Sequence, residues 1–180
     1  MYWDANNLYG WAMSQALPYA DIQFEQVELE DILNTSDDSE VGYIVECDFT
    51  FPEELHDKFK EFPPCPETLT PSLEWFSEFQ KEVGGKTGII KKGKYRGTNK
   101  LVPHLFDHKN YVLHYRNLKF IKELGVEITK VHRVLSFKQK AWLKEYIDFN
   151  TEKRKGARNE FEKDFFKLMN NSVFGRRWKT

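Results

Sequence analysis

Alternating and helical patterns of hydrophobic positions predict both strands and helices in this chain. A period of two predicts strands over residues 41–49 and 126–135. Apolar residues at helical spacing predict a helix over residues 111–124, which ends at Gly125. The prolines between residues 52 and 71 exclude long regular elements in that stretch. The mixture of both patterns predicts an α+β fold.

The C-terminal part of the sequence predicts an antiparallel helical hairpin. The tetrad SFKQ (136–139) has the form of a capping box, so a helix is expected from there to about Asn150. Gly156 permits a reversal of the chain, and a last helix is expected from about Ala157 to Val173. The basic segment KRKGAR (153–158) then lies at the tip of the hairpin.

The N-terminal part is predicted as a short strand, a turn and a helix that begins near Leu8. Leu17-Pro18 interrupts this pattern. Residues 21–40 are acidic, and the polar run at 34–39 reads as a flexible loop. Gly84-Gly85 is expected to open a basic loop.

The last predicted helix has a cationic face. At about 100° per residue, with Lys163 at zero, a single stripe within about 80° holds four further side chains: Lys167, Asn170, Asn171 and Phe174. The opposite side holds Phe161, Phe165 and Leu168, through which the helix is expected to pack. Two lysines one turn apart repel each other, and a bound polyanion would relieve the repulsion. A solvated face with acidic neighbours explains the same pattern, and both interpretations are open.

Asp4 lies at the end of the predicted first strand and before a turn. A carboxylate there can hold Mg²⁺ together with a backbone carbonyl oxygen, and N–H groups of the turn can face phosphate oxygens. The alternative is that Asp4 caps the helix that begins near Leu8.

Two segments resemble motifs A and B of family B DNA polymerases, in their protein-primed branch of organellar, viral and Maverick/Polinton-type enzymes. Motif A of the family, Asp-x-x-Ser-Leu-Tyr-Pro, is similar to DANNLYG (4–10), and motif B, Lys-x-x-x-Asn-Ser-x-Tyr-Gly, is similar to KLMNNSVFG (167–175). The stretches at 109–118 and 136–139 resemble the element-encoded members. Gly10, Asn7 and Phe174 depart from the family's proline, serine and tyrosine.

The resemblance implies a partial polymerase palm with an insertion region, followed by a helical hairpin that forms the fingers. The expected parts are a palm segment with motif A (1–16), a palm and insertion region that is acidic and then basic (17–135), and the fingers with motif B (136–180). The aspartate pair of the family's motif C does not follow motif B in this sequence. The chain is therefore expected to be a piece of a polymerase that is inactive alone.

The resemblance also implies a two-metal Mg²⁺ site for nucleotidyl transfer. Asp4 would be one ligand, with the carbonyl of Ala5, and Lys163 and Lys167 would act as catalytic cations on the triphosphate. Arg154 would be a third cation, with Lys153 and Arg158 as competitors. The remaining nucleotide-binding residues would be Tyr9 under the sugar, where it excludes a 2′-hydroxyl, together with Leu8, Asn171, Phe174 and Gly175.

The charge distribution is consistent with nucleic-acid binding. Residues 1–85 hold 3 Lys and Arg against 19 Asp and Glu, whereas residues 86–180 hold 24 against 9. A basic half can bind a phosphate backbone, particularly through the clusters at 86–100 and 153–158. Alternatively, the two halves neutralise each other within one fold. Tyr95 in the first cluster can stack on a base or can simply pack. The implied partners are template and primer DNA, a dNTP and a terminal-protein primer.

Other classes of protein are disfavoured. The sequence has no apolar run of 18 residues and opens with no signal peptide, so an intracellular protein of nuclear, viral or organellar setting is expected, neither secreted nor membrane-bound. Cys47 and Cys65 form no Cys-x-x-Cys pair, so reduced thiols and no zinc site are expected. No catalytic role is expected for His104, His108 or His132. The alternative function is an inactive polymerase remnant that only binds nucleic acid.

Overall fold

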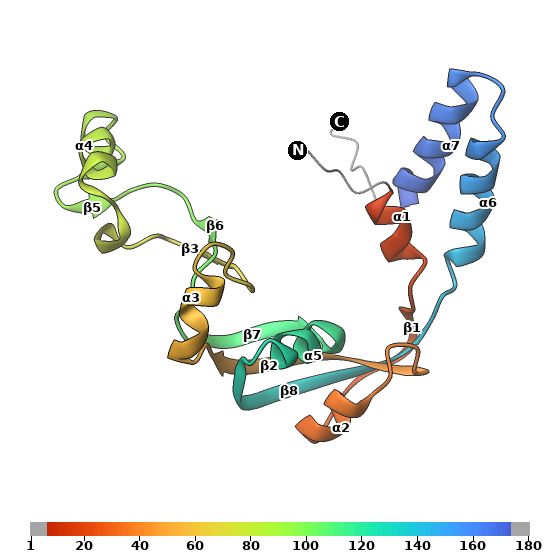
Figure 1. Ribbon diagram of the computed structural model, residues 1–180, viewed down its shortest axis with the longest axis horizontal. Coiled ribbons are helices and arrows are strands. Elements are labelled where there is room, and N and C mark those ends of the chain that lie inside the picture. Colours follow the sequence, from red (N-terminus) through yellow and green to blue (C-terminus); the bar gives the residue numbers. More distant parts are fainter. Residues whose placement is uncertain (1–6, 174–180) are drawn as a thin grey trace. The chain divides into compact units, whose positions relative to one another are not determined.

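The computed structural model describes residues 7–173 and combines helices with β-sheet (Figure 1), which confirms the α+β class. Its larger sheet has the strand order β1-β8-β2-β7. The strands are β1 (Leu17–Glu25), β2 (Val41–Thr50), β7 (His108–His114) and β8 (Glu127–Lys140). The chain divides into two compact units, and β2, β7 and β8 contribute residues to both.

The first unit holds the described residues up to 46, residues 112–116 and those from 133 onward. Its helices are α1 (Leu8–Met13), α2 (Leu29–Asn34), α6 (Lys144–Lys155) and α7 (Glu160–Val173). Helices α6 and α7 lie side by side as the predicted antiparallel hairpin, and α1 contacts both (Figure 1). Gly156 caps the C-terminus of α6, as expected, and the Asn159 side chain accepts the Glu162 N–H at 2.8 Å at the start of α7.

The second unit comprises residues 47–111 and 117–132. It contains short helical turns (Glu53–Leu55, Leu73–Trp75), α3 (His56–Phe59), α4 (Glu78–Lys86), and most of α5 (Tyr115–Glu123). Strand β3 (Glu67–Leu69) pairs with β6 (Lys100–Val102), and β4 (Ile90–Lys91) pairs with β5 (Lys94–Tyr95).

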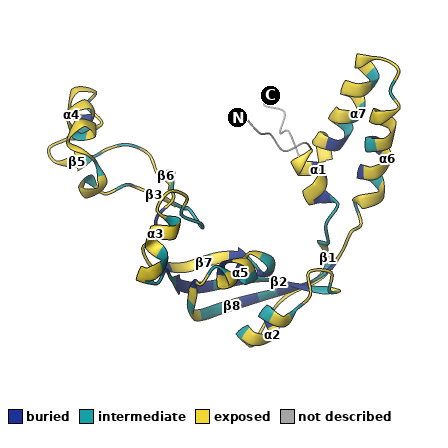
Figure 2. Ribbon diagram, viewed as in Figure 1, coloured by how far each residue is buried: buried dark blue, intermediate teal, exposed yellow. Residues whose placement is uncertain are grey.

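Buried side chains lie mainly along the central strands and α5 (Figure 2). Val45, Cys47 and Phe49 alternate along β2 and are fully buried, as the period-two pattern predicts. The predicted end of α5 at Gly125 is also confirmed. Gly125 has φ 101°, its N–H bonds to the Lys122 carbonyl, and the next N–H bonds to the Ile121 carbonyl. These two bonds form a Schellman motif.

Two helix predictions are wrong at their N-terminal ends. Residues 111–114 belong to β7, so the helix begins only at Tyr115. The tetrad 136–139 does not cap a helix, because it belongs to β8, where Ser136 pairs with Gln23 and Gln139 with Pro18 of β1. The following helix begins at Lys144. Pairing with a distant strand outweighs the local capping pattern here.

The acidic stretch contains more regular structure than predicted. Strand β1 spans Leu17-Pro18, and Pro18 is tolerated because β1 is an edge strand. Helix α2 occupies residues 29–34. Gly84-Gly85 lies within α4 rather than opening a loop, and this helix begins at a capping box formed by Ser77 and Gln80. Among the described residues, no helix is both long and apolar enough to cross a membrane.

Candidate nucleotide-binding site

The cationic face of α7 is exposed, as predicted. Lys163, Lys167 and Asn171 are all exposed on this helix. The Lys163 ammonium lies 2.6 Å from Glu160 Oε1, and this contact lowers the pKa of the Glu160 carboxyl. Lys167 forms no ion pair with any residue from 7 to 173. The two lysines therefore differ: Lys163 is ion-paired on its own helix, and Lys167 has no ion-pair partner among the described residues.

The packing face of α7 is not the predicted one. Phe161, Phe165 and Leu168 are 79%, 46% and 54% exposed. The helix instead packs through the side that carries Met169 and Asn170. Asn170 is 4% exposed and donates to Thr151 Oγ1 at 3.3 Å, so it does not share the exposed stripe of the lysines.

Tyr146 of α6 strengthens this contact, because its hydroxyl donates to the Met169 carbonyl at 3.3 Å. The buried side of α7 therefore lies between its cationic face and its apolar face. An apolar stripe in a sequence identifies a surface that can be buried, but the neighbouring helix determines which side is buried in this unit.

Helix α1 presents the residues that follow Asp4 in motif A. Leu8 and Tyr9 are 57% and 59% exposed, whereas Gly10 is buried. Asn7 has φ 57°, and its side chain lies over Gly10, where an added Cβ would come within 2.3 Å of Asn7 Nδ2. The glycine in place of the family's proline therefore has a local explanation, since the asparagine side chain occupies the space.

Several predicted site residues lie outside the described residues. Asp4 and Ala5, the predicted metal ligands, precede residue 7, and Phe174 and Gly175 follow residue 173. Their assignment remains a prediction from the sequence. Within the described residues, Leu8, Tyr9, Arg154, Lys163, Lys167 and Asn171 all belong to the first unit.

The basic residues at the tip of the α6–α7 hairpin make different contacts. Lys155 pairs with Glu152 at 2.6 Å. Lys153 Nζ lies 5.4 Å from the centre of the Phe149 ring, a cation–π contact. Arg154 is exposed and makes no ion pair with the described part of the chain. Arg158 is also exposed, and its side chain forms no ion pair within the described residues, so Arg154 and Arg158 are both able to bind a further anionic group.

The basic segment at 86–100 forms a tight hairpin in the second unit. Lys92 and Gly93 connect β4 to β5 with φ values of 50° and 67°, and two successive positive φ values are typical of the two-residue turns that join antiparallel strands. The Tyr95 ring packs against Phe76 with centroids 5.3 Å apart. The packing interpretation of Tyr95 thus accounts for its position, and the lysines of the turn remain exposed.

One well-organised polar cluster was missed in the sequence analysis. The Asp48 carboxylate accepts the Asn110 N–H at 2.8 Å and the His132 Nε2–H at 2.7 Å, and Lys109 Nζ lies 3.5 Å away. The Asn110 N–H first, and then His132, lower the pKa of Asp48 to about 2. No local pattern reveals this cluster, because Asp48 is separated from each of its partners by more than 60 positions along the chain.

The solved structures that are similar to this chain have a DNA polymerase fold. The structure of Phi29 DNA polymerase in its orthorhombic crystal form aligns with a TM-score of 0.54 and 21% identity, over 96% of this chain and 25% of that chain. A Phi29 DNA polymerase complex with primer-template DNA and incoming nucleotide substrates aligns with a TM-score of 0.48 and 22% identity, over 96% of this chain and 25% of that chain. The chain thus spans about a quarter of the Phi29 polymerase.

The family model for type B DNA polymerases, organellar and viral, matches residues 1–177. The chain belongs to this family, which confirms the resemblance inferred from the two motifs. A search of curated protein sequences gives no match.

Proposed function

We propose that this chain is the part of a DNA-directed DNA polymerase that carries motifs A and B and binds the incoming dNTP. The observation that carries the proposal is the contact of α1 with both α6 and α7 within one compact unit. This contact joins the helix that follows Asp4 to the helix that presents Lys163 and Lys167. Family membership over residues 1–177 supports the same assignment.

In the proposed reaction, the primer 3′-hydroxyl attacks the α-phosphate of the dNTP and pyrophosphate leaves. Mg²⁺ held by Asp4 and the Ala5 carbonyl would stabilise the attacking and leaving oxygens, together with a second carboxylate that the resemblance assigns to motif C. Lys163 and Lys167 neutralise the triphosphate, and Arg154 supplies a third positive charge. Motif C is absent from this sequence, so the 180-residue chain alone is expected to be inactive in primer extension.

The other nucleotide-binding residues would select the substrate. Tyr9 would lie under the sugar and exclude a 2′-hydroxyl, with Leu8 beside it. Asn171, Phe174 and Gly175 would line the nascent base pair. The exposure of Leu8, Tyr9 and Asn171 supports these roles, because their side chains are accessible to a nucleotide.

The two lysines are expected to contribute unequally. Lys163 must leave Glu160, 2.6 Å away, before it can bind a phosphate, whereas Lys167 forms no ion pair with the described residues. A charge-assisted hydrogen bond to a phosphate contributes about 1.5–3 kcal/mol, which is about 10- to 150-fold in Kd. Lys167→Ala is therefore expected to weaken dNTP binding within this range, and Lys163→Ala is expected to weaken it less.

A fluorescent dATP analogue tests these values by anisotropy with the purified 180-residue chain at low ionic strength. Lys144→Ala is the matched control, because Lys144 is also exposed and pairs with an acidic residue on its own helix, Asp148 at 2.5 Å. The control should keep wild-type affinity. Equal affinities for wild type, Lys144→Ala and Lys163→Ala/Lys167→Ala would contradict the proposed triphosphate site.

The basic turn of the β4–β5 hairpin and Arg154 at the α6–α7 tip favour a second function, a module that only binds nucleic acid. This function predicts DNA binding that weakens with salt but survives both Asp4→Ala and removal of Mg²⁺. Under the polymerase proposal, by contrast, dNTP binding requires the α7 lysines. The proposal also includes a terminal protein that serves as primer, in a viral or organellar setting. Electrophoretic mobility shifts with primer-template DNA, with and without EDTA, separate the two.

A further inference from the structure

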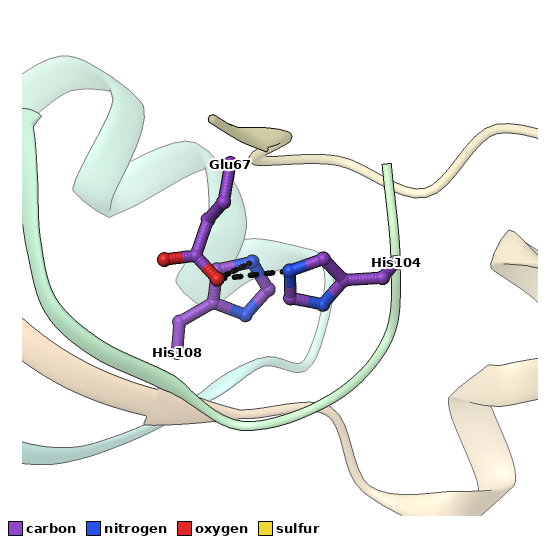
Figure 3. Close-up of side chains that lie close together, drawn as sticks. All are labelled: Glu67, His104 and His108. Atoms are coloured by element: carbon purple, nitrogen blue, oxygen red, sulfur yellow. Dashed lines mark hydrogen bonds and ion pairs between the residues drawn. The ribbon is translucent and has the colours of Figure 1, made fainter. Parts of the chain in front are cut away.

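A half-buried carboxylate and two buried imidazoles meet in the second unit, away from the proposed nucleotide site in sequence. His104 Nε2 lies 2.8 Å from Glu67 Oε2, and His108 Nε2 lies 3.8 Å from the same oxygen (Figure 3). The three ligand-type atoms all lie within 4.8 Å of one another. The two imidazole rings stack, with centroids 4.5 Å apart and planes at 17°.

The pairing of two short strands brings these residues together. Glu67 begins β3 and pairs with Val102 of β6. His104 follows Val102 by two residues, and His108 begins β7. A single strand pairing therefore brings Glu67 close to a His-x-x-x-His sequence that lies 37 positions further along the chain.

The surroundings of the cluster are largely apolar. His108 is 0% exposed and His104 is 9% exposed. The Phe49 ring stacks on His108 with centroids 4.5 Å apart, and Phe106 lies 5.4 Å from the ring of His104. The Tyr111 hydroxyl donates to the carbonyl of Pro66, the residue before Glu67, and so fixes the carboxylate-bearing segment.

Neither buried imidazole uses all of its hydrogen-bonding capacity. The Nδ1 atoms of His104 and His108 are buried and have no hydrogen-bond partner within the described structure. His108 Nε2 lies 2.9 Å from the Cys65 carbonyl and donates to it.

We propose that Glu67, His104 and His108 bind a single Zn²⁺ ion, with the carboxylate oxygen and the two Nε2 atoms as ligands. Two imidazoles and a carboxylate are a common three-residue ligand set for this ion. Tetrahedral bonds of about 2.0–2.1 Å place ligand atoms about 3.3 Å apart. The distances of 2.8 Å and 3.8 Å from Glu67 Oε2 to the two nitrogens lie on either side of this value.

Zinc binding requires only small local changes. In both imidazoles the proton must occupy Nδ1 instead of Nε2, because His104 Nε2 now donates to Glu67 and His108 Nε2 to the Cys65 carbonyl, and only then do both Nε2 lone pairs face the metal. The two rings must also tilt from their stacked arrangement. The Cys65 carbonyl oxygen, already 2.9 Å from His108 Nε2, or a water molecule completes the coordination.

A bound ion would join the two ends of the segment between Glu67 and His104. This segment carries α4 and the β4–β5 hairpin with its basic turn. Because the ion connects residues distant in sequence and binds only the folded chain, it would stabilise the second unit. The proposed role is structural and does not depend on dNTP binding.

The test uses the untagged 180-residue chain, stripped with EDTA, then incubated with excess Zn²⁺ and dialysed to remove unbound metal. Zinc per chain is measured by elemental analysis, affinity by competition with a chromophoric chelator, and geometry by the visible absorption of the Co²⁺ form. The variants are Glu67→Gln, His104→Gln and His108→Gln. His132→Gln is the control, because His132 also pairs with a carboxylate but lies in a different cluster.

We expect one zinc per chain in the wild type and in His132→Gln, with a tetrahedral Co²⁺ spectrum. Loss of a ligand should weaken zinc binding by more than about tenfold and abolish any rise in thermal midpoint on addition of zinc. Glu67→Gln preserves the shape of the site, so it is decisive if a buried histidine variant fails to fold. Less than one zinc per wild-type chain, or wild-type affinity in folded Glu67→Gln and His104→Gln, would overturn the proposal.

Discussion

The Tyr115 hydroxyl is the centre of a buried hydrogen-bond network in the first unit, and its removal gives a quantitative test of the fold. Tyr115 is 0% exposed. Its hydroxyl donates to the Ser36 carbonyl at 3.0 Å, with the Asp37 carbonyl 3.2 Å away, and accepts from Gln139 Nε2 at 2.9 Å. The network therefore joins the loop after α2 to the end of β8.

Tyr115→Phe removes the hydroxyl and leaves the ring. Two hydrogen bonds are lost, and each contributes about 1 kcal/mol net. The Gln139 amide keeps its second bond, to the Ser39 carbonyl at 2.9 Å, which limits the cost on that side. We expect the free energy of unfolding to fall by about 2 kcal/mol, which lowers the thermal midpoint by about 4–8 °C in a chain of this size.

Urea denaturation followed by circular dichroism measures this change, and an unaltered dependence on urea shows that the unfolding reaction is the same. Tyr146→Phe is the matched control in the same unit. Its hydroxyl makes one longer hydrogen bond, 3.3 Å to the Met169 carbonyl, so the expected loss is under about 1 kcal/mol.

A double-mutant cycle that combines Tyr115→Phe with Gln139→Leu tests whether Gln139 contacts Tyr115, as in the structure, or caps a helix, as the capping-box pattern of residues 136–139 predicts. In the structure the two side chains are bonded, which predicts a coupling free energy of about 1 kcal/mol. If Gln139 instead capped an exposed helix, it would not contact Tyr115. A coupling below about 0.3 kcal/mol would refute the network.

Two further predictions concern the second unit. The Asn110 N–H and His132 lower the pKa of Asp48 from 3.8 to about 2. The ionised Asp48 carboxylate therefore stabilises the folded state fully above about pH 4, and this stabilisation is lost as the pH falls towards 2. In urea titrations at successive pH values, the free energy of unfolding of Asp48→Asn should fall less at acid pH than that of the wild type. Parallel pH profiles for the two proteins would contradict the assignment of this loss to Asp48. Gly125→Ala places a side chain at φ 101° and a Cβ 3.1 Å from Leu55 Cδ1. It should lower the free energy of unfolding by about 1–3 kcal/mol, and wild-type stability would contradict the strain.

The parts of the fold that depend on local chemistry could be predicted from the sequence. The strand at 41–49 follows from alternation, and the helix end at Gly125, which has φ 101°, follows from the conformational freedom of glycine. Helix α6 also ends at Gly156, but with an ordinary φ of −86°. The tetrad SFKQ could not be assigned correctly, because its residues fit both a capping box and an alternating strand. Only the partner strand β1, more than 110 residues away, determines the outcome.

The same reasoning applies to the candidate sites. The lysine face of α7 could be predicted because side chains one turn apart on a helix share a face whatever surrounds them. The cluster of Glu67, His104 and His108 could be recognised only in part. The four-position separation of the two histidines is visible in the sequence, but the carboxylate reaches them through the β3–β6 pairing.

The packing of α7 shows why a helix face is harder to assign than a helix. Phe161, Phe165 and Leu168 form the most apolar stripe of α7, yet they are exposed, while Asn170 is buried. The Asn170 amide donates to Thr151 of α6, which offsets part of the cost of its burial, while its buried Oδ1 has no hydrogen-bond partner among residues 7–173. The choice of face therefore depends on complementarity with α6, which hydrophobicity alone does not encode. It leaves the lysine face of α7 uncovered by α6, as the proposed binding of a triphosphate requires.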